Sequence, residues 1–271
     1  HFENGGIASD SIFLNTSIRS ENLDTKLNNA QNTVSQLGFQ YNHEYRLGQF
    51  QVDTIKRDKD TVLNYIYKGK ISFIQDIKAD RFYRIYSDVP SSFYENIYLD
   101  STATFDSTAL KYFENGMFIN FNLINNSDKQ NKLKIMGGIR NLLYEYDISL
   151  SKQFYQFHYL SGALLFENKR NTFKTNLDYC FAGDAMFDLE LNAEHDLLIS
   201  ENASLQTNFE YSFIEPDVLL YNYSSNHFKW DNDFSKSMTI SARTKMNLNK
   251  YNLSLGTNLY HLYNYLIFNE Q

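Results

Sequence analysis

The sequence predicts an all-β protein, namely an antiparallel transmembrane β-barrel of about 12 long strands that is incomplete within this chain. The first observation behind this prediction is strict alternation of polar and apolar residues in many segments. The second is an aromatic content of 16%, with 22 Phe and 21 Tyr but one Trp. Such residues suit the interfacial girdles of membrane strands better than a soluble core. The third is that no apolar run approaches the roughly 20 residues that a membrane helix needs.

The segment "MFDLELNAEHDLL", residues 186–198, shows the alternation most clearly. Asp188, Glu190, Glu194 and Asp196 share one face, and mainly Phe, Leu and Ala occupy the other. Successive side chains of a strand point to opposite faces. We therefore expect the carboxylates to face water or cations, and the opposite face to be buried in protein or in lipid.

The same pattern recurs along the chain. The further predicted strands, in chain order, lie near residues 11–19, 36–48, 62–75, 109–124, 132–144, 153–166, 171–181, 203–213, 238–248 and 251–260. Many approach the roughly 9–11 residues that a tilted strand needs to cross a bilayer, whereas soluble strands average about 5 or 6. A soluble sandwich of so many long strands would expose wide sheet edges. Closure into a barrel pairs every backbone group, as lipid requires, so the barrel is the favoured interpretation.

Two stretches without clean alternation are predicted to be long loops of a single domain that covers residues 1–271. Residues 88–108 contain one of the two Pro residues and many Ser, Thr and Asp, and residues 215–228 contain the other Pro. The chain opens at His1 without a Met or an apolar signal segment. We interpret it as an internal piece of a longer chain.

Composition and motifs argue against several function classes. The formal charge of −7 argues against a nucleic-acid binder. The single cysteine, Cys180, excludes an intrachain disulfide and a Cys-based metal cluster. Residues 231–233 lack the Gly and terminal Glu of a calcium loop, and "SSNHF" at 224–228 offers a Ser and a His without a G-x-S-x-G elbow. We therefore expect no enzyme activity, no metal site and no cofactor.

Charged rows on the polar faces are the candidate pore-lining residues. They are Lys68, Lys70, Lys132, Lys134, Arg140, Asp178, Asp188, Glu190, Glu194, Asp196, Arg243 and Lys245. Opposed acidic and basic rows would set a field that filters charged solutes in a water-filled lumen. Two alternatives stay open: the rows pair and plug the lumen, or they are simply the solvated side of ordinary strands.

Four stretches carry a likeness beyond their periodicity. They are "LNNAQNTVSQLGFQYNHEYRLG" at 27–48, "FYENIYLDSTATFDSTALKYFENGMFINF" at 93–121, "LLYNYSSNHFKWDNDFSKSMT" at 219–239 and "YHLYNYLIFNE" at 260–270. In these stretches the chain resembles the β-barrel porins of Bacteroidota. The resemblance implies a barrel in the outer membrane of a Gram-negative cell, with a transport role. It also implies a partial member, because such barrels usually end on an aromatic residue and this chain ends at "NEQ", residues 269–271.

These observations predict passive diffusion or transport of small solutes, with outer-membrane lipid and the solutes as the partners. Leu191 is expected to face lipid and Asn192 to face water. Two alternatives are retained: a non-conducting barrel that scaffolds a secretion or surface complex, and a soluble carbohydrate-binding β-sandwich. The solute and the oligomeric state, including a homo-oligomer, stay open.

Overall fold

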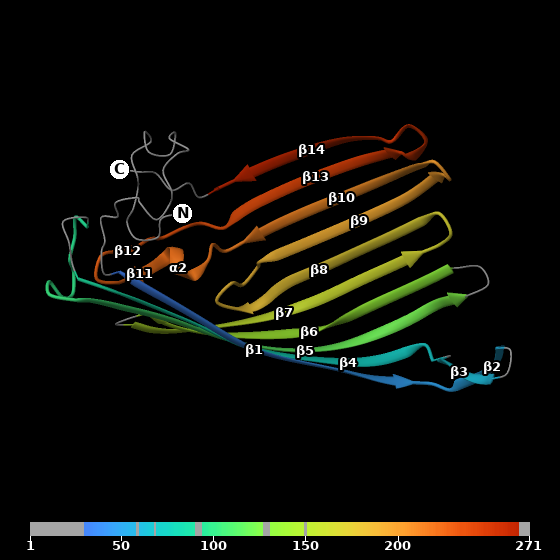
Figure 1. Cartoon of the computed structure of the whole chain (residues 1–271), viewed down its shortest axis with the longest axis horizontal. Coiled ribbons are helices and arrows are strands. Elements are labelled where there is room, and N and C mark those ends of the chain that lie inside the picture. The colour runs from blue at the N-terminus through green and yellow to red at the C-terminus, as the bar shows by residue number, and fades with distance from the viewer. Residues whose placement is uncertain are drawn as a thin grey trace.

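A single large antiparallel sheet dominates the fold (Figure 1). The computed structural model describes residues 30–57, 60–67, 69–89, 94–126, 131–148 and 151–265. In sheet order, the ten strands are β1 (Gln31–Leu47), β4 (Ile71–Asp88), β5 (Thr104–Asn126), β6 (Asn131–Ile148), β7 (Ser151–Glu167), β8 (Asn171–Gly183), β9 (Leu189–Ser200), β10 (Ala203–Ile214), β13 (Ser237–Leu248) and β14 (Leu253–Tyr263). The predicted all-β class and antiparallel arrangement are confirmed. Within the described ranges the sheet is open, since β1 and β14 each pair on one side only.

The remaining elements are small. They are two ribbons, β2 (Phe50–Arg57) with β3 (Asp60–Tyr67) and β11 (Asn222–Ser224) with β12 (Lys229–Asp231), and two helical turns, α2 (Val218–Tyr221) and η2 (Asn249–Tyr251). None of the helices in the described ranges has the length and apolarity to cross a membrane.

Several predicted boundaries differ from the structure: β2 was not predicted, and β4 continues to Asp88, beyond the predicted end at residue 75. The predicted strand at 62–75 is divided between β3 and β4, because the chain leaves one ribbon at Tyr67 and enters the main sheet at Ile71. The predicted loop at 88–108 is shorter, because β5 already begins at Thr104. Thr and Ser residues on both faces hide the alternation there. The predicted strand near 11–19 lies outside the described residues.

The register separates two faces of the sheet. Residues paired across neighbouring antiparallel strands share a face, so one row can be followed from strand to strand. Such a row runs through Tyr45, Phe73, Ile119, Gly137, Gly162, Leu177, Leu191, Tyr211, Ile240 and His261. We call this side the apolar face and the opposite side the polar face.

The two ends of the sheet differ. Residues 168–170, 201–202 and 249–252 make short turns at one end, where the β2–β3 ribbon also lies. The connections between β4 and β5, between β8 and β9 (residues 184–188) and between β10 and β13 (residues 215–236) lie at the other end, on the left in Figure 1. Strands β4 to β7 have 17 to 23 residues and project towards this loop end, whereas β8, β9, β10, β13 and β14 have 11 to 13 residues. Short turns at one end and long loops at the other are typical of outer-membrane barrels.

The most buried apolar cluster lies on the polar face at the loop end. It contains Leu142, Phe157, Tyr159, Cys180 and Ala185, with tyrosines of β5 to β7 packed against it. The sheet therefore has its small core where the loops meet the polar face.

Candidate functional site

The polar face brings together most of the charged residues singled out in the sequence. Nine of them lie on it, in β6, β8, β9 and β13: Lys132, Lys134, Arg140, Asp178, Glu190, Glu194, Asp196, Arg243 and Lys245. Alternation places them there, because each has the parity of its strand's polar residues. Strands that are far apart in the sequence thus contribute to one continuous charged surface.

Three other candidates lie elsewhere. Lys68 lies outside the described residues, and Lys70 is an exposed residue in the bend before β4. Asp188 precedes β9 and is set apart from the acidic row, because the chain turns at Phe187, whose φ is 74°. The uninterrupted strand predicted over 186–198 is therefore wrong at its start.

Arg140 contacts acidic and aromatic residues of three other strands on the polar face. Its guanidinium lies 3.3 Å from an oxygen of Asp178 and 3.7 Å from an oxygen of Glu114. It also sits over the Tyr159 ring, 4.9 Å from the ring centroid. Its partners come from β5, β7 and β8, so one cation joins four neighbouring strands. Partial burial makes such a charge pair stronger than one in bulk water.

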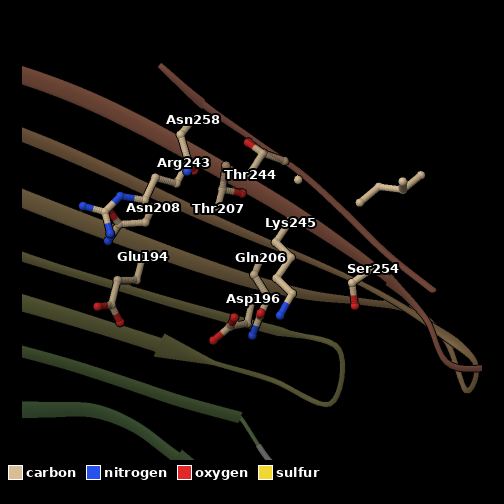
Figure 2. Close-up of a pocket in the computed structure, with 12 residues that line it drawn as sticks. Glu194, Asp196, Gln206, Thr207, Asn208, Arg243, Thr244, Lys245, Ser254 and Asn258 are labelled. Atoms are coloured by element: carbon tan, nitrogen blue, oxygen red, sulfur yellow. The ribbon is translucent and has the colours of Figure 1, made fainter. Parts of the chain in front are cut away.

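A second charged region lies over β9, β10, β13 and β14, beside an open hollow of about 620 Å³. Figure 2 shows Glu194 and Asp196 near Arg243 and Lys245 there. Glu194 is 3.9 Å from Lys174, and Arg243 is 3.4 Å from Glu210. Acidic residues of β9 and β10 thus lie beside basic residues of β8 and β13. The field of this region is local and mixed in sign, unlike a field between two opposed walls.

The connection at residues 215–236 was not recognised as part of the site from the sequence. Lys236 lies 2.5 Å from an oxygen of Asp188 and 3.3 Å from one of Glu215. The backbone N–H of Glu215 donates to the same Asp188 carboxylate at 3.0 Å. Asp188 therefore ties both ends of this connection to the start of β9.

The tip of the β11–β12 ribbon docks far away, on the polar-face ends of β4 and β5. The Asn226 side-chain oxygen accepts hydrogen bonds from the backbone N–H groups of Leu99 and Asp100, at 3.0 and 2.9 Å. The Asn226 backbone N–H donates to Asp106 at 2.8 Å. The His227 ring lies 2.7 Å from the Thr104 hydroxyl. Asn226, His227, Thr104 and Asp106 are all buried.

Tyr94 completes this contact from the loop at 89–103. Its ring stacks on His227 with centroids 3.8 Å apart, and its hydroxyl lies 3.0 Å from that of Tyr86. Burial raises the pKa of the Tyr94 phenol above its ordinary value. The docked ribbon is therefore held by a buried polar network as well as by ring stacking.

This docking determines which face is concave. A single connection between β10 and β13 reaches the polar-face ends of β4 and β5, at least five places away in the sheet order. Such a contact requires the sheet to curve with its polar face inwards. The connection consequently lies over the loop-end mouth of the concave side.

Comparison with known families gives a match over the whole chain. A family model described as "Putative porin" matches residues 1–271. The chain belongs to this porin family. No curated protein and no solved structure matches the chain. For a member of a porin family, a charged concave face and an apolar convex face are the arrangement that a membrane channel needs.

No group of His, Cys, Asp and Glu side chains within the described ranges of this porin-family chain could hold a metal ion. The Ser and His of "SSNHF" have structural roles: Ser225 accepts from the Phe228 N–H at 3.1 Å within the ribbon tip, and His227 docks on Thr104. The sequence could not predict that these residues are buried, because Ser, Asn and His are equally common in exposed turns.

Proposed function

We propose that the chain is part of a porin-like barrel in the outer membrane of a Gram-negative cell, and that it passes small hydrophilic solutes through a charged, water-filled lumen. The observation that carries this proposal is the separation of the two faces on one curved sheet. Membership of the porin family supports the same conclusion.

The apolar face is suited to lipid. Its large side chains are open to the surroundings in this chain, with Leu259 67% exposed and Leu160 49% exposed. A contiguous apolar surface of this kind is too large for a soluble monomer. On β6 it extends from Leu133 to Leu143 before Glu145, close to the roughly 9–11 residues that a tilted strand needs to cross a bilayer.

The positions of charged residues on the apolar face support the same boundary for the lipid-facing stretch. Lys111, Glu145 and Lys152 form a network there, with N–O distances of 2.6 and 2.8 Å. They lie on the loop-end projections of β5, β6 and β7, beyond the apolar stretch. Below them, the His158 ring bonds to Asn141 at 2.7 Å, which satisfies two polar groups near the rim.

The polar face is suited to water and to ions. Several of its acidic and basic residues are paired between neighbouring strands, so we expect only modest selectivity between cations and anions. The connection at 215–236 narrows the mouth at the loop end. In lipid, β1 and β14 need partners for their free edges, and we propose that these edges pair when the barrel closes.

The proposal also extends to the domain organisation, the partners and the absence of enzyme activity expected from the sequence. We propose one barrel domain over residues 1–271, with lipid and small solutes as partners. We propose no enzyme activity, no cofactor and no nucleic-acid partner.

Conductance in planar bilayers tests the proposal. The full-length protein, purified in detergent, should migrate faster on gels before boiling than after it, and should give stepwise conductance. The double variant Glu194→Gln/Asp196→Asn should move the reversal potential in a KCl gradient towards anion selectivity. Glu201→Gln, in a turn outside the strands, is the matched control and should leave it unchanged.

A heat-modifiable protein without conductance would favour the non-conducting scaffold. A protein that is soluble without detergent and indifferent to boiling would favour the carbohydrate-binding sandwich. Either result would overturn the proposed channel.

A further inference from the structure

A cavity of about 700 Å³ lies at the loop end, between the polar face of β5 to β7 and the connection at 215–236. Its floor consists of aromatic side chains, chiefly Tyr144, Tyr146, Tyr155, Phe157 and Tyr159. Its roof includes residues from α2 and its flanks. Cavities of this size hold small organic molecules.

The floor presents ring faces and edges at close range. Tyr144 packs edge-on to Phe157 with centroids 5.5 Å apart, and Tyr146 packs edge-on to Tyr155 at 6.0 Å. Edge-to-face packing leaves the electron-rich faces of some rings directed away from the cluster. Such faces attract cations.

The rim carries an excess of negative charge. Asp184, Asp188, Glu215, Asp217 and Asp233 line the cavity, and no Lys, Arg or His is among its described lining residues. Lys236 lies just outside and contacts Asp188 and Glu215. Among the described residues, Asp184, Asp217 and Asp233 therefore have no cationic partner.

Two hydroxyl groups in the floor also lack partners. Tyr146 is 5% exposed and Tyr159 is 9% exposed. Neither hydroxyl has a hydrogen-bond partner within the part of the chain that the structure describes. Neither oxygen is among the buried polar atoms without a partner, so both hydroxyls are open to the cavity, where a ligand can form hydrogen bonds with them.

We propose that this cavity binds an organic cation, that is, an ammonium group attached to an apolar body. The ammonium would lie between the ring faces and the carboxylates of Asp184, Asp217 and Asp233, and the body would lie against the aromatic floor. The inference rests on the proposed function in taking the polar face as the water-filled one.

Other ligand classes fit less well. An anion would meet five carboxylates and no unpaired cation. An inorganic cation would leave the aromatic floor unused, and the described residues offer no cluster for a metal ion. A neutral sugar could stack on the rings, but it would leave the excess charge unbalanced.

Binding of benzyltrimethylammonium to the purified full-length protein tests the proposal. Titration calorimetry at low ionic strength, in a polyoxyethylene detergent that offers no sugar headgroup, should give saturable binding with a Kd of about 0.1–1 mM. Asp184→Asn/Asp217→Asn should weaken it about tenfold. Both Asn side chains can still accept the backbone hydrogen bonds of Gln156 and Leu219, so the local structure is retained.

Asp231→Asn, an exposed carboxylate of the same connection that does not line the cavity, is the matched control and should change Kd less than twofold. If the double variant fails to fold, Asp233→Asn alone should still weaken binding about threefold. Equal binding of benzoate or glucose, or unchanged binding by the charge-neutralised variants, would overturn the proposal. Because binding is measured without conduction, absent conductance with intact binding would count against the channel alone.

Discussion

The side-chain amide of Asn226 donates a 2.9 Å hydrogen bond to the Thr104 hydroxyl, although 122 positions separate the two residues in the sequence. The same amide group donates to the Asp100 carbonyl, also at 2.9 Å. Asn226 therefore uses both side-chain atoms to hold the β11–β12 ribbon on β5 and on the loop before it. This contact places the connection at 215–236 over the polar face.

Asn226→Ala should release the ribbon. The substitution removes the hydrogen bonds to the backbone of Leu99 and Asp100 and the buried one to the Thr104 hydroxyl, at a cost of about 1–3 kcal/mol. We expect trypsin to cleave after Lys229 about ten times faster, because cleavage follows the population of the open form. Asn232→Ala removes an exposed Asn with one bond to the Leu220 carbonyl and serves as the control. Equal cleavage of the two variants would show that Asn226 does not hold the ribbon.

Leu191→Arg and Asn192→Arg test which face meets lipid. Leu191 pairs with Leu177 and Tyr211 on the apolar face, whereas Asn192 pairs with Asn176 and Glu210 on the polar face. A charge facing the bilayer midplane costs about 2–4 kcal/mol, and a lumen-side charge costs little. Urea unfolding in lipid vesicles should therefore separate the two variants. Similar unfolding free energies would mean that the faces are assigned wrongly.

Arg140→Gln should make the channel more selective for cations. Removing the guanidinium leaves the carboxylates of Glu114 and Asp178 uncompensated on the polar face. We expect the K⁺/Cl⁻ permeability ratio from reversal potentials to rise about two- to fivefold. Arg81→Gln removes the same charge from the opposite face, where Arg81 pairs with Leu37 and Lys111. This control should leave the ratio unchanged.

Docking of the ribbon should depend on pH through Tyr94. Burial raises the pKa of this phenol above its ordinary value of 10.0, so the folded protein favours the protonated form. The resulting stability is fully present below pH 10 and is lost as the pH rises through the higher folded pKa. The difference in absorbance at 295 nm between the wild type and Tyr94→Phe should show a midpoint above pH 10. A midpoint at or below 10 would contradict burial of the phenol.

Alternation predicted most strands of the main sheet and their faces, although it missed β2 and the part of β4 beyond residue 75. Phe173, Leu177 and Leu191 were assigned to one face, and Asp178 and Glu190 to the other, as the register has them. The prediction succeeded because the period of a strand is a local property of the chain. It failed at Asp188, where the positive φ of Phe187 breaks the period, and at Thr104, where polar residues on both faces conceal it.

The pairing of charges could not be derived in this way. Lys174 meets Glu194, and Arg243 meets Glu210, because turn lengths set the register between neighbouring strands. A shift of one residue would move every side chain to the other face. Single-strand patterns therefore identify the charged rows but not the partner of each charge.

The sequence alone thus establishes a sheet with one face for water and one for an apolar environment, since each residue's parity depends only on its near neighbours. Curvature, the docking of Asn226 and the tyrosine-lined cavity depend on contacts between residues more than 100 positions apart, such as Asn226 with Thr104. These contacts arise from the fold as a whole. They determine which face is concave and which segment lies over the loop end of that face. No local sequence pattern predicts either property.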